Sequence, residues 1–162
     1  MPRFDRFDLI TIIAIAALVS AAIFIGVTDT TSSVAVAAKK AAAAPMDPGL
    51  SQKVESARLL LESGQPREAI DGLKAVEAAA PAYPEPHALL GLSYSKTMDY
   101  TLAVREFRLA LSIDPSYADS KSPKFIGKRI KTAVKEARRA GASAAALNDI
   151  QYIDRMLAGG CE

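Results

Sequence analysis

The sequence has almost none of the two residue types that most often carry metal and nucleophilic chemistry. It contains one Cys and one His among 162 residues. A single Cys excludes an intrachain disulfide and a Cys-based metal site, and a single His excludes the two-His zinc motifs. The chain also lacks a P-loop and the Gly-rich dinucleotide motif. We therefore expect a protein that is not an enzyme and has no catalytic residue, cofactor or metal.

Aromatic residues and net charge are also low. Aromatics make up 6% of the chain, Trp is missing, and the formal net charge is +2. A charge so close to neutral selects no class of partner by itself. Hydrophobic residues nevertheless reach 50%, and Ala supplies much of that share. Ala favours helices more than any other residue, so the composition predicts an all-α fold.

A long uncharged run lies near the N-terminus. After a stub of residues 1–8, residues 9–27 contain no charged side chain. As a helix, these residues would extend about 28 Å, close to the ~30 Å hydrocarbon core of a bilayer. We expect a single transmembrane helix that serves as a signal anchor. The alternative is a cleaved secretory signal peptide, for which Ala35-Val36-Ala37 offers a small-residue cleavage site.

Positive charge predicts the orientation of this segment. Arg3 and Arg6 precede it, and no basic residue follows until Lys39. Because positive residues favour the cytoplasmic side, we expect the remainder of the chain outside the cytoplasm, anchored to the inner membrane. Cleavage would instead release a soluble periplasmic protein. Residues 28–49 are rich in Ala, Thr, Ser and Pro and are expected to form a linker.

The next 68 residues repeat with a period of 34. Residues 50–83 align without a gap on residues 84–117. Small residues, large residues and Pro recur at the same places in both blocks. The positions that define the repeat are Ala57, Ala69, Gly91, Tyr94, Ala103, Phe107, Ala110 and Pro115.

This pattern resembles the tetratricopeptide repeat (TPR). The second block has the small, aromatic, Ala and Pro residues at all six characteristic positions of that family, and the first block is a degenerate copy. The resemblance implies a short α-solenoid of helical hairpins. The expected helices span residues 50–63, 66–79, 84–97 and 100–112. Asp47, Asp99 and Ser143 are expected N-caps.

Residues 118–162 are expected to add a C-terminal capping hairpin or divergent repeat. Apolar residues recur at helical spacing from Pro123 to Ala140, which predicts an elongated first helix. Gly141 ends that helix, and a second helix is expected from Ser143. Such a hairpin would cover the otherwise exposed end of a two-repeat array.

The family resemblance also implies a concave face built from the first helix of each repeat. The residues expected to line it are Val54, Arg58, Leu61, Glu62, Ala88, Leu92, Ser95 and Lys96. Such a groove suits a helix or an extended peptide of a partner protein. The alternative is that the groove is filled by the protein's own C-terminal helices or by a neighbouring chain.

Charge is unevenly distributed along the chain. Residues 47–119 carry 7 basic and 11 acidic side chains, whereas residues 121–139 carry 8 basic and 1 acidic. Six of the basic residues are spaced by three and four, which predicts a basic stripe along one helix. The stripe consists of Lys121, Lys124, Lys128, Lys131, Lys135 and Arg138. It is a solvated face, or a site for an acidic protein or anionic lipid; nucleic acid is the least expected partner.

These features predict a membrane-tethered, non-enzymatic adaptor that binds another protein. An assembly factor or accessory subunit of a bacterial envelope complex fits best. The alternative is a permanent structural subunit of a membrane complex. His87 is expected to be packed in the core rather than to act in catalysis.

Overall fold

The computed structural model describes residues 45–159. Within this range the chain forms six α-helices, one short 3-10 helix and no strand, which confirms the expected all-α class. The helices are α2 (Pro48–Glu62), α3 (Pro66–Ala79), α4 (Pro84–Lys96), α5 (Tyr100–Ile113), η1 (Pro115–Tyr117), α6 (Gly127–Arg139) and α7 (Ala144–Gly159).

The expected transmembrane segment, residues 9–27, lies outside the described residues, as do the stub and residues 28–44 of the linker. Among the helices that are described, none has both the length and the hydropathy that crossing a membrane requires.

The first helix starts earlier than expected. α2 begins at Pro48 because Asp47 caps it: the Asp47 carboxylate accepts hydrogen bonds from the amides of Gly49 and Leu50, at 2.9 and 3.3 Å. Pro is well suited to the first helical position, where its missing N–H removes no helical bond. The predicted linker boundary at residue 49 is therefore wrong by two residues.

The 34-residue period is present in the backbone. α3 and α5 are both 14 residues long and begin 34 residues apart, and α2 and α4 also end 34 residues apart. The two turns within the hairpins close in the same way. The amide of Gln65 donates to Leu60 at 2.8 Å, and the amide of Asp99 donates to Tyr94 at 2.9 Å. The two hairpins are therefore structural copies.

Both turns contain a residue in the left-handed backbone conformation. Gly64 has φ of 83° in the first turn, and Met98 has φ of 66° at the equivalent place in the second. Gly adopts this conformation without strain, but a residue with a side chain pays about 1–2 kcal/mol for it. The second turn is thus the more strained of the two.

Close packing inside the second hairpin explains the small residue at position 91. A Cβ atom on Gly91 would lie 2.6 Å from the ring of Phe107, which is completely buried. The large ring of α5 therefore occupies the space that the missing side chain of α4 leaves free. The other repeat-defining residues of helices α2–α5 are buried as well, whereas Pro115 is exposed and begins η1.

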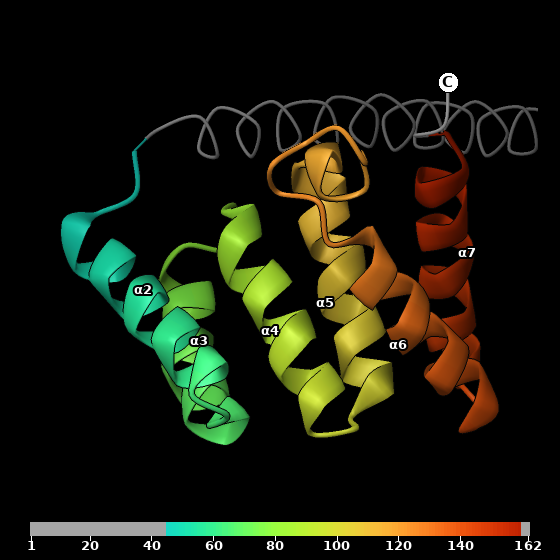
Figure 1. Ribbon diagram of the computed structural model, residues 1–162, viewed down its shortest axis with the longest axis horizontal. Helices are drawn as coiled ribbons and strands as arrows, with labels where there is room; N and C mark the ends of the chain where they lie inside the picture. Colours follow the sequence, from blue (N-terminus) through green and yellow to red (C-terminus); the bar gives the residue numbers. More distant parts are fainter. Residues whose placement is uncertain (1–44, 160–162) are drawn as a thin grey trace, which may run out of the picture. The chain divides into compact units, whose positions relative to one another are not determined.

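α4 is the most buried helix. Nine consecutive residues from Pro86 to Tyr94 are buried, because α4 packs against α5 and α3 and also contacts α2. Figure 1 shows α4 between the first hairpin and α5. Ser93 lies within this stretch and satisfies its hydroxyl by donating to the Leu89 carbonyl at 2.8 Å. This continuous burial places α4 at the centre of the core.

The third hairpin differs from the prediction. Its first helix begins at Gly127 rather than Pro123 and has 13 residues, so the expected elongated helix is wrong. The preceding segment is held as a loop, in which the Ile126 amide donates to the Tyr117 carbonyl at 3.1 Å. α6 and α7 each pack more extensively on α5 than on one another. They therefore form a looser pair than the first two hairpins (Figure 1).

Candidate functional site

The apolar residues of the expected concave face are largely covered. Val54, Leu61, Ala88 and Leu92 are all buried, and Leu92 is the most exposed of them at 9%. α2 and α4 therefore use these side chains for their own packing. Binding of a partner to this face stays a prediction. The apolar surface that the face exposes is smaller than the sequence pattern indicated.

Two cations of the same face hold the first helices together. Arg58 on α2 forms ion pairs with Glu85 on α4 and with Glu55, the latter at 3.2 Å. The Lys96 ammonium donates to the Leu61 carbonyl at 2.9 Å, which caps the C-terminal end of α2. These charges connect the two repeats.

Ser95, Glu62 and Lys96, three polar members of the face, differ in exposure. Ser95 is half-buried, and its hydroxyl donates to the Gly91 carbonyl at 2.8 Å. Glu62 and Lys96 are exposed at the end of the face. The polar surface that the face offers to a partner is therefore concentrated near the C-terminal ends of α2 and α4.

The basic stripe is only partly helical. Lys121 and Lys124 lie in the loop before α6, so the predicted continuous stripe on a single helix is wrong at its N-terminal end. Lys124 pairs with Asp114 at 2.9 Å, and Arg138 pairs with Asp154 on α7. Lys128, Lys131 and Lys135 are exposed on α6. These three lysines supply the accessible charge of the stripe on α6, and Lys121 is exposed in the preceding loop.

A pocket lies beside this charge. It has a volume of about 580 Å³ and is formed by α6 and α7. Its lining consists of Lys131, Val134, Lys135, Arg138, Arg139, Asp154, Leu157 and Ala158. Four cations thus surround apolar side chains, and the single acidic group among them is paired with Arg138. The loose packing of α6 on α7 explains why a hollow remains there.

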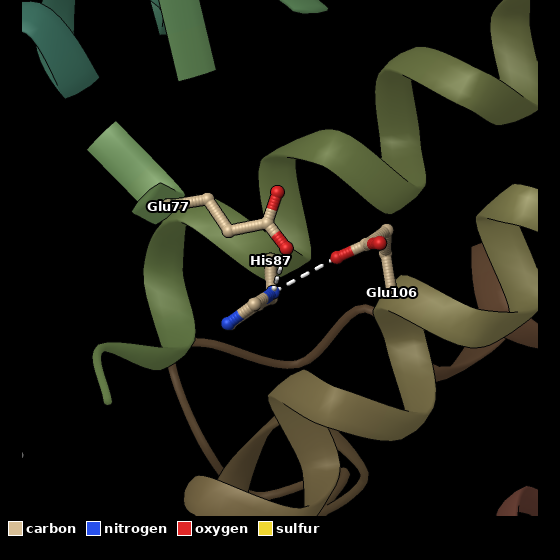
Figure 2. A group of neighbouring side chains, drawn as sticks. All are labelled: Glu77, His87 and Glu106. Atoms are coloured by element: carbon tan, nitrogen blue, oxygen red, sulfur yellow. Dashed lines mark hydrogen bonds and ion pairs between the residues drawn. The ribbon is translucent and has the colours of Figure 1, made fainter. Parts of the chain in front are cut away.

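A second cluster is buried between three helices. Glu77 on α3, His87 on α4 and Glu106 on α5 turn their side chains toward one another (Figure 2). The Nδ1 atom of His87 lies 2.8 Å from Glu106 and 3.7 Å from Glu77. The side chains of His87 and Glu106 are 4% and 6% exposed, and that of Glu77 is 27% exposed. We call Glu77, His87 and Glu106 the buried triad.

The partners of His87 fix its protonation. Nδ1 faces the Glu106 carboxylate, and Nε2 lies 3.1 Å from the Pro81 carbonyl oxygen. Both neighbours can accept a hydrogen bond, so the surroundings favour the protonated ring, in which both nitrogens donate. Burial is the largest influence on the pKa of His87 and lowers it. The bonds to Glu106 and Pro81, with the charges of Glu106 and Glu77, outweigh burial and raise this pKa above its ordinary value.

Sequence reasoning predicted the burial of His87 and missed its two carboxylate partners. A signal for both of them existed. Glu106 lies three residues after Ala103 and four before Ala110, which places a carboxylate on the buried face of α5. A charged residue at such a position is rarely buried without a partner. The same kind of spacing marks Glu77, which lies four residues after the buried Leu73 and three before the buried Ala80.

Models of known protein families, curated proteins and solved structures yield no match to this chain. The function must therefore be argued from the residues and their geometry.

Proposed function

We propose that the protein is a membrane-tethered, non-enzymatic adaptor of the TPR type. The gapless 34-residue period, with matching helix ends and turn hydrogen bonds, supports the helical repeat. The uncharged segment 9–27 supports the tether, and its flanking arginines support an extracytoplasmic repeat domain in a bacterial envelope. In this role the domain recruits or positions another protein as an assembly factor or accessory subunit.

The observation that carries the proposal is the basic pocket of α6 and α7. Its accessible apolar residues, Leu157 and Ala158, share the lining with four cations, of which Lys131 and Lys135 have no ion-pair partner within residues 45–159. The surface therefore offers apolar contact together with several unneutralised positive charges. An acidic amphipathic helix or peptide of a partner protein complements both properties.

Site-specific photo-crosslinking in cells tests this role. A photoreactive residue at position 131 should give discrete adducts with one or a few proteins, at a segment rich in Asp and Glu. Lys131→Glu combined with Lys135→Glu should weaken capture by at least ~10-fold, because two attractive charges become repulsive. Crosslinking for this comparison uses a photoreactive residue in place of Ala158, which lines the same pocket and is exposed, in all variants.

A matched control makes the test specific. Lys53 and Lys74 are exposed on α2 and α3, so Lys53→Glu combined with Lys74→Glu changes the net charge equally at a distance from the pocket. Equal loss of capture in both double variants would show a non-specific charge effect and contradict the proposal. Adducts with lipid alone would also contradict it, because they would assign the stripe to the membrane surface.

A second candidate role is a permanent structural subunit. The burial of Val54, Leu61, Ala88 and Leu92 favours it, because a closed concave face leaves little groove for transient ligands. Under this alternative, the protein co-purifies with its complex at constant stoichiometry through detergent and salt washes. An adaptor held by the basic pocket is instead released by salt, because screening weakens exposed charge pairs.

A further inference from the structure

The buried triad has more negative than positive charge. Even a protonated His87 supplies only one positive charge against two carboxylates, so the site carries net negative charge and is mostly shielded from water. Isolated charge in such surroundings is costly unless it is paired or binds a metal. A divalent cation bound to two carboxylates and a neutral imidazole would instead give a net charge of zero.

The three ligand atoms lie close enough together to converge on one ion. One nitrogen and two oxygens lie within 4.8 Å of one another. In a tetrahedral zinc site with bonds of about 2.0–2.1 Å, ligand atoms are about 3.3 Å apart. The observed Nδ1 separations of 2.8 and 3.7 Å lie on either side of that value. Shifts of about half an ångström would bring these ligand separations to the zinc value.

The ring of His87 is already oriented as in metal proteins. A metal-bound His typically donates its other ring N–H to a backbone carbonyl or a carboxylate, which fixes the ring and its tautomer. His87 makes this bond through Nε2 to the Pro81 carbonyl, at 3.1 Å, and directs Nδ1 at the two carboxylates. Figure 2 shows both carboxylates on the Nδ1 side of the ring.

The site has a route to solvent on one side. The Glu77 side chain is 27% exposed, whereas Glu106 and His87 lie deeper. A cation can therefore enter beside Glu77, and a water molecule can fill the fourth coordination position from the same side. The ligands come from α3, α4 and α5, so a bound ion would connect the first hairpin to the second.

We propose that Glu77, His87 and Glu106 bind a divalent transition-metal ion such as Zn²⁺, which joins the two repeats. On binding, the metal forms bonds to Nδ1 and to one oxygen of each carboxylate, and the Nδ1 proton leaves to solvent as H⁺. No oxidation or reduction takes place. The imidazole nitrogen favours Zn²⁺ and its neighbours in the transition series over Mg²⁺ and Ca²⁺, which prefer oxygen ligands alone.

The test uses the untagged full-length chain in detergent, because a His tag would bind the same ions. It carries Cys161→Ser to remove the single thiol. Zn²⁺ is titrated by calorimetry, and thermal unfolding is followed with Zn²⁺ and with a chelator. We expect one Zn²⁺ per chain and a rise in Tm on metal addition, because an ion that binds the folded state alone stabilises it. Co²⁺ should give the visible spectrum of a tetrahedral site.

Two variants separate a metal site from a structural ion pair. Glu77→Gln removes the most exposed ligand and leaves the 2.8 Å bond between His87 and Glu106 in place, so the metal-free variant should stay folded. Its Zn²⁺ affinity should fall by ~10-fold or more, since even losing a residue that only supports a ligand costs 10–100-fold. Glu68→Gln, an exposed carboxylate on the same helix, makes the same charge change and should leave affinity unchanged.

Three results would overturn the proposal. The first is no saturable Zn²⁺ binding by the folded chain. The second is equal affinity in the Glu77→Gln and Glu68→Gln variants, which would assign binding to scattered surface carboxylates. The third is a Tm that falls with Zn²⁺, which would show preferential binding to the unfolded chain. Any of these would leave the triad as a closed ion-pair cluster.

Discussion

The second and third hairpins differ in how closely their helices pack and in where their charged side chains lie. In the second, α4 and α5 approach closely through Gly91 and Phe107, and His87 and Glu106 pair inside the core. In the third, α6 and α7 lean on α5 rather than on each other, and the cations face solvent. Inside the tightly packed hairpin the charges are paired, whereas the loose packing of the third hairpin leaves a pocket with an accessible basic rim.

Equivalent glycine substitutions in the two hairpins provide the largest test of this contrast. A Cβ on Gly91 would lie 2.6 Å from the fully buried Phe107 ring, and one on Gly127 would lie 2.3 Å from the Phe125 ring. Phe125 is half-buried in a loop and can move aside, but Phe107 cannot. We expect Gly91→Ala to lower the free energy of unfolding by about 1–3 kcal/mol, as overpacking of cores does.

Gly127→Ala should lower the free energy of unfolding by less than half as much as Gly91→Ala. Urea denaturation of both variants under the same conditions measures the difference. Gly72→Ala serves as a control, because nothing lies within 4 Å of a Cβ at that helical position. It should raise the free energy of unfolding by about 0.5–1 kcal/mol through helix propensity. Equal losses for Gly91→Ala and Gly127→Ala would contradict the difference in packing between the hairpins.

The turns of the second and third hairpins differ in strain, because only the second has a residue with a side chain in the left-handed conformation. Met98 holds φ of 66° in the second hairpin, whereas Gly141 holds φ of 78° in the third. Met98→Gly should relieve about 1–2 kcal/mol of strain. Part of that gain is lost to the greater freedom of Gly in the unfolded chain, about 0.4–1 kcal/mol.

A net rise of about 0.5–1 kcal/mol in the free energy of unfolding is therefore expected for Met98→Gly. Gly141→Ala should change it in the opposite direction by about 1 kcal/mol, and thermal denaturation measures both. A neutral or destabilising Met98→Gly would show that the Met98 side chain, which is 73% exposed, makes a contribution its exposure does not indicate.

The repeat region could be predicted from the sequence because a local pattern determines it. Period, turn residues and small–large pairs such as Gly91 and Phe107 fix α2 to α5, and the observed ends fall within two residues of the expected ones. The third hairpin was predicted less well. The apolar spacing from Pro123 continues into α6, but the Ile126–Tyr117 backbone bond holds the preceding segment as a loop. A contact between separate segments leaves no trace in helical periodicity.

The same distinction between local spacing and tertiary contact explains why the basic stripe could be predicted and the buried triad could not. Lys128, Lys131 and Lys135 follow one another on α6, so their spacing predicted a common face. Glu77, His87 and Glu106 come from three helices and meet only through the packing of the hairpins. Arg58 and Lys96 were expected to face a partner, but they bind Glu85 and the Leu61 carbonyl across the repeat boundary. Such pairings depend on tertiary geometry that the residue spacing does not contain.

The smallest expected effect on stability comes from Asp114, which pairs with Lys124 between the second and third hairpins. Burial raises the pKa of Asp114, but hydrogen bonds from Ser116 and Lys124 outweigh it and hold this pKa below its ordinary value. The charged carboxylate therefore stabilises the fold above the ordinary Asp pKa of about 4. This contribution is lost as the pH falls through the lowered pKa. Because Lys124 is exposed, we expect only about 0.2–1 kcal/mol.

Urea denaturation between neutral and acidic pH measures this contribution. Asp114→Asn should lower stability at neutral pH and narrow its gap to wild type as the pH falls below 4. Asp119→Asn is the control, because the Asp119 carboxylate accepts only the Lys121 amide in the same loop, at 2.8 Å, and has no ion-pair partner among the described residues. If Asp114→Asn keeps a constant gap at all pH values, the carboxylate contributes through its shape and not its charge. The loop that precedes α6 would then be held by the Ile126–Tyr117 backbone bond without an electrostatic contribution from Asp114 and Lys124.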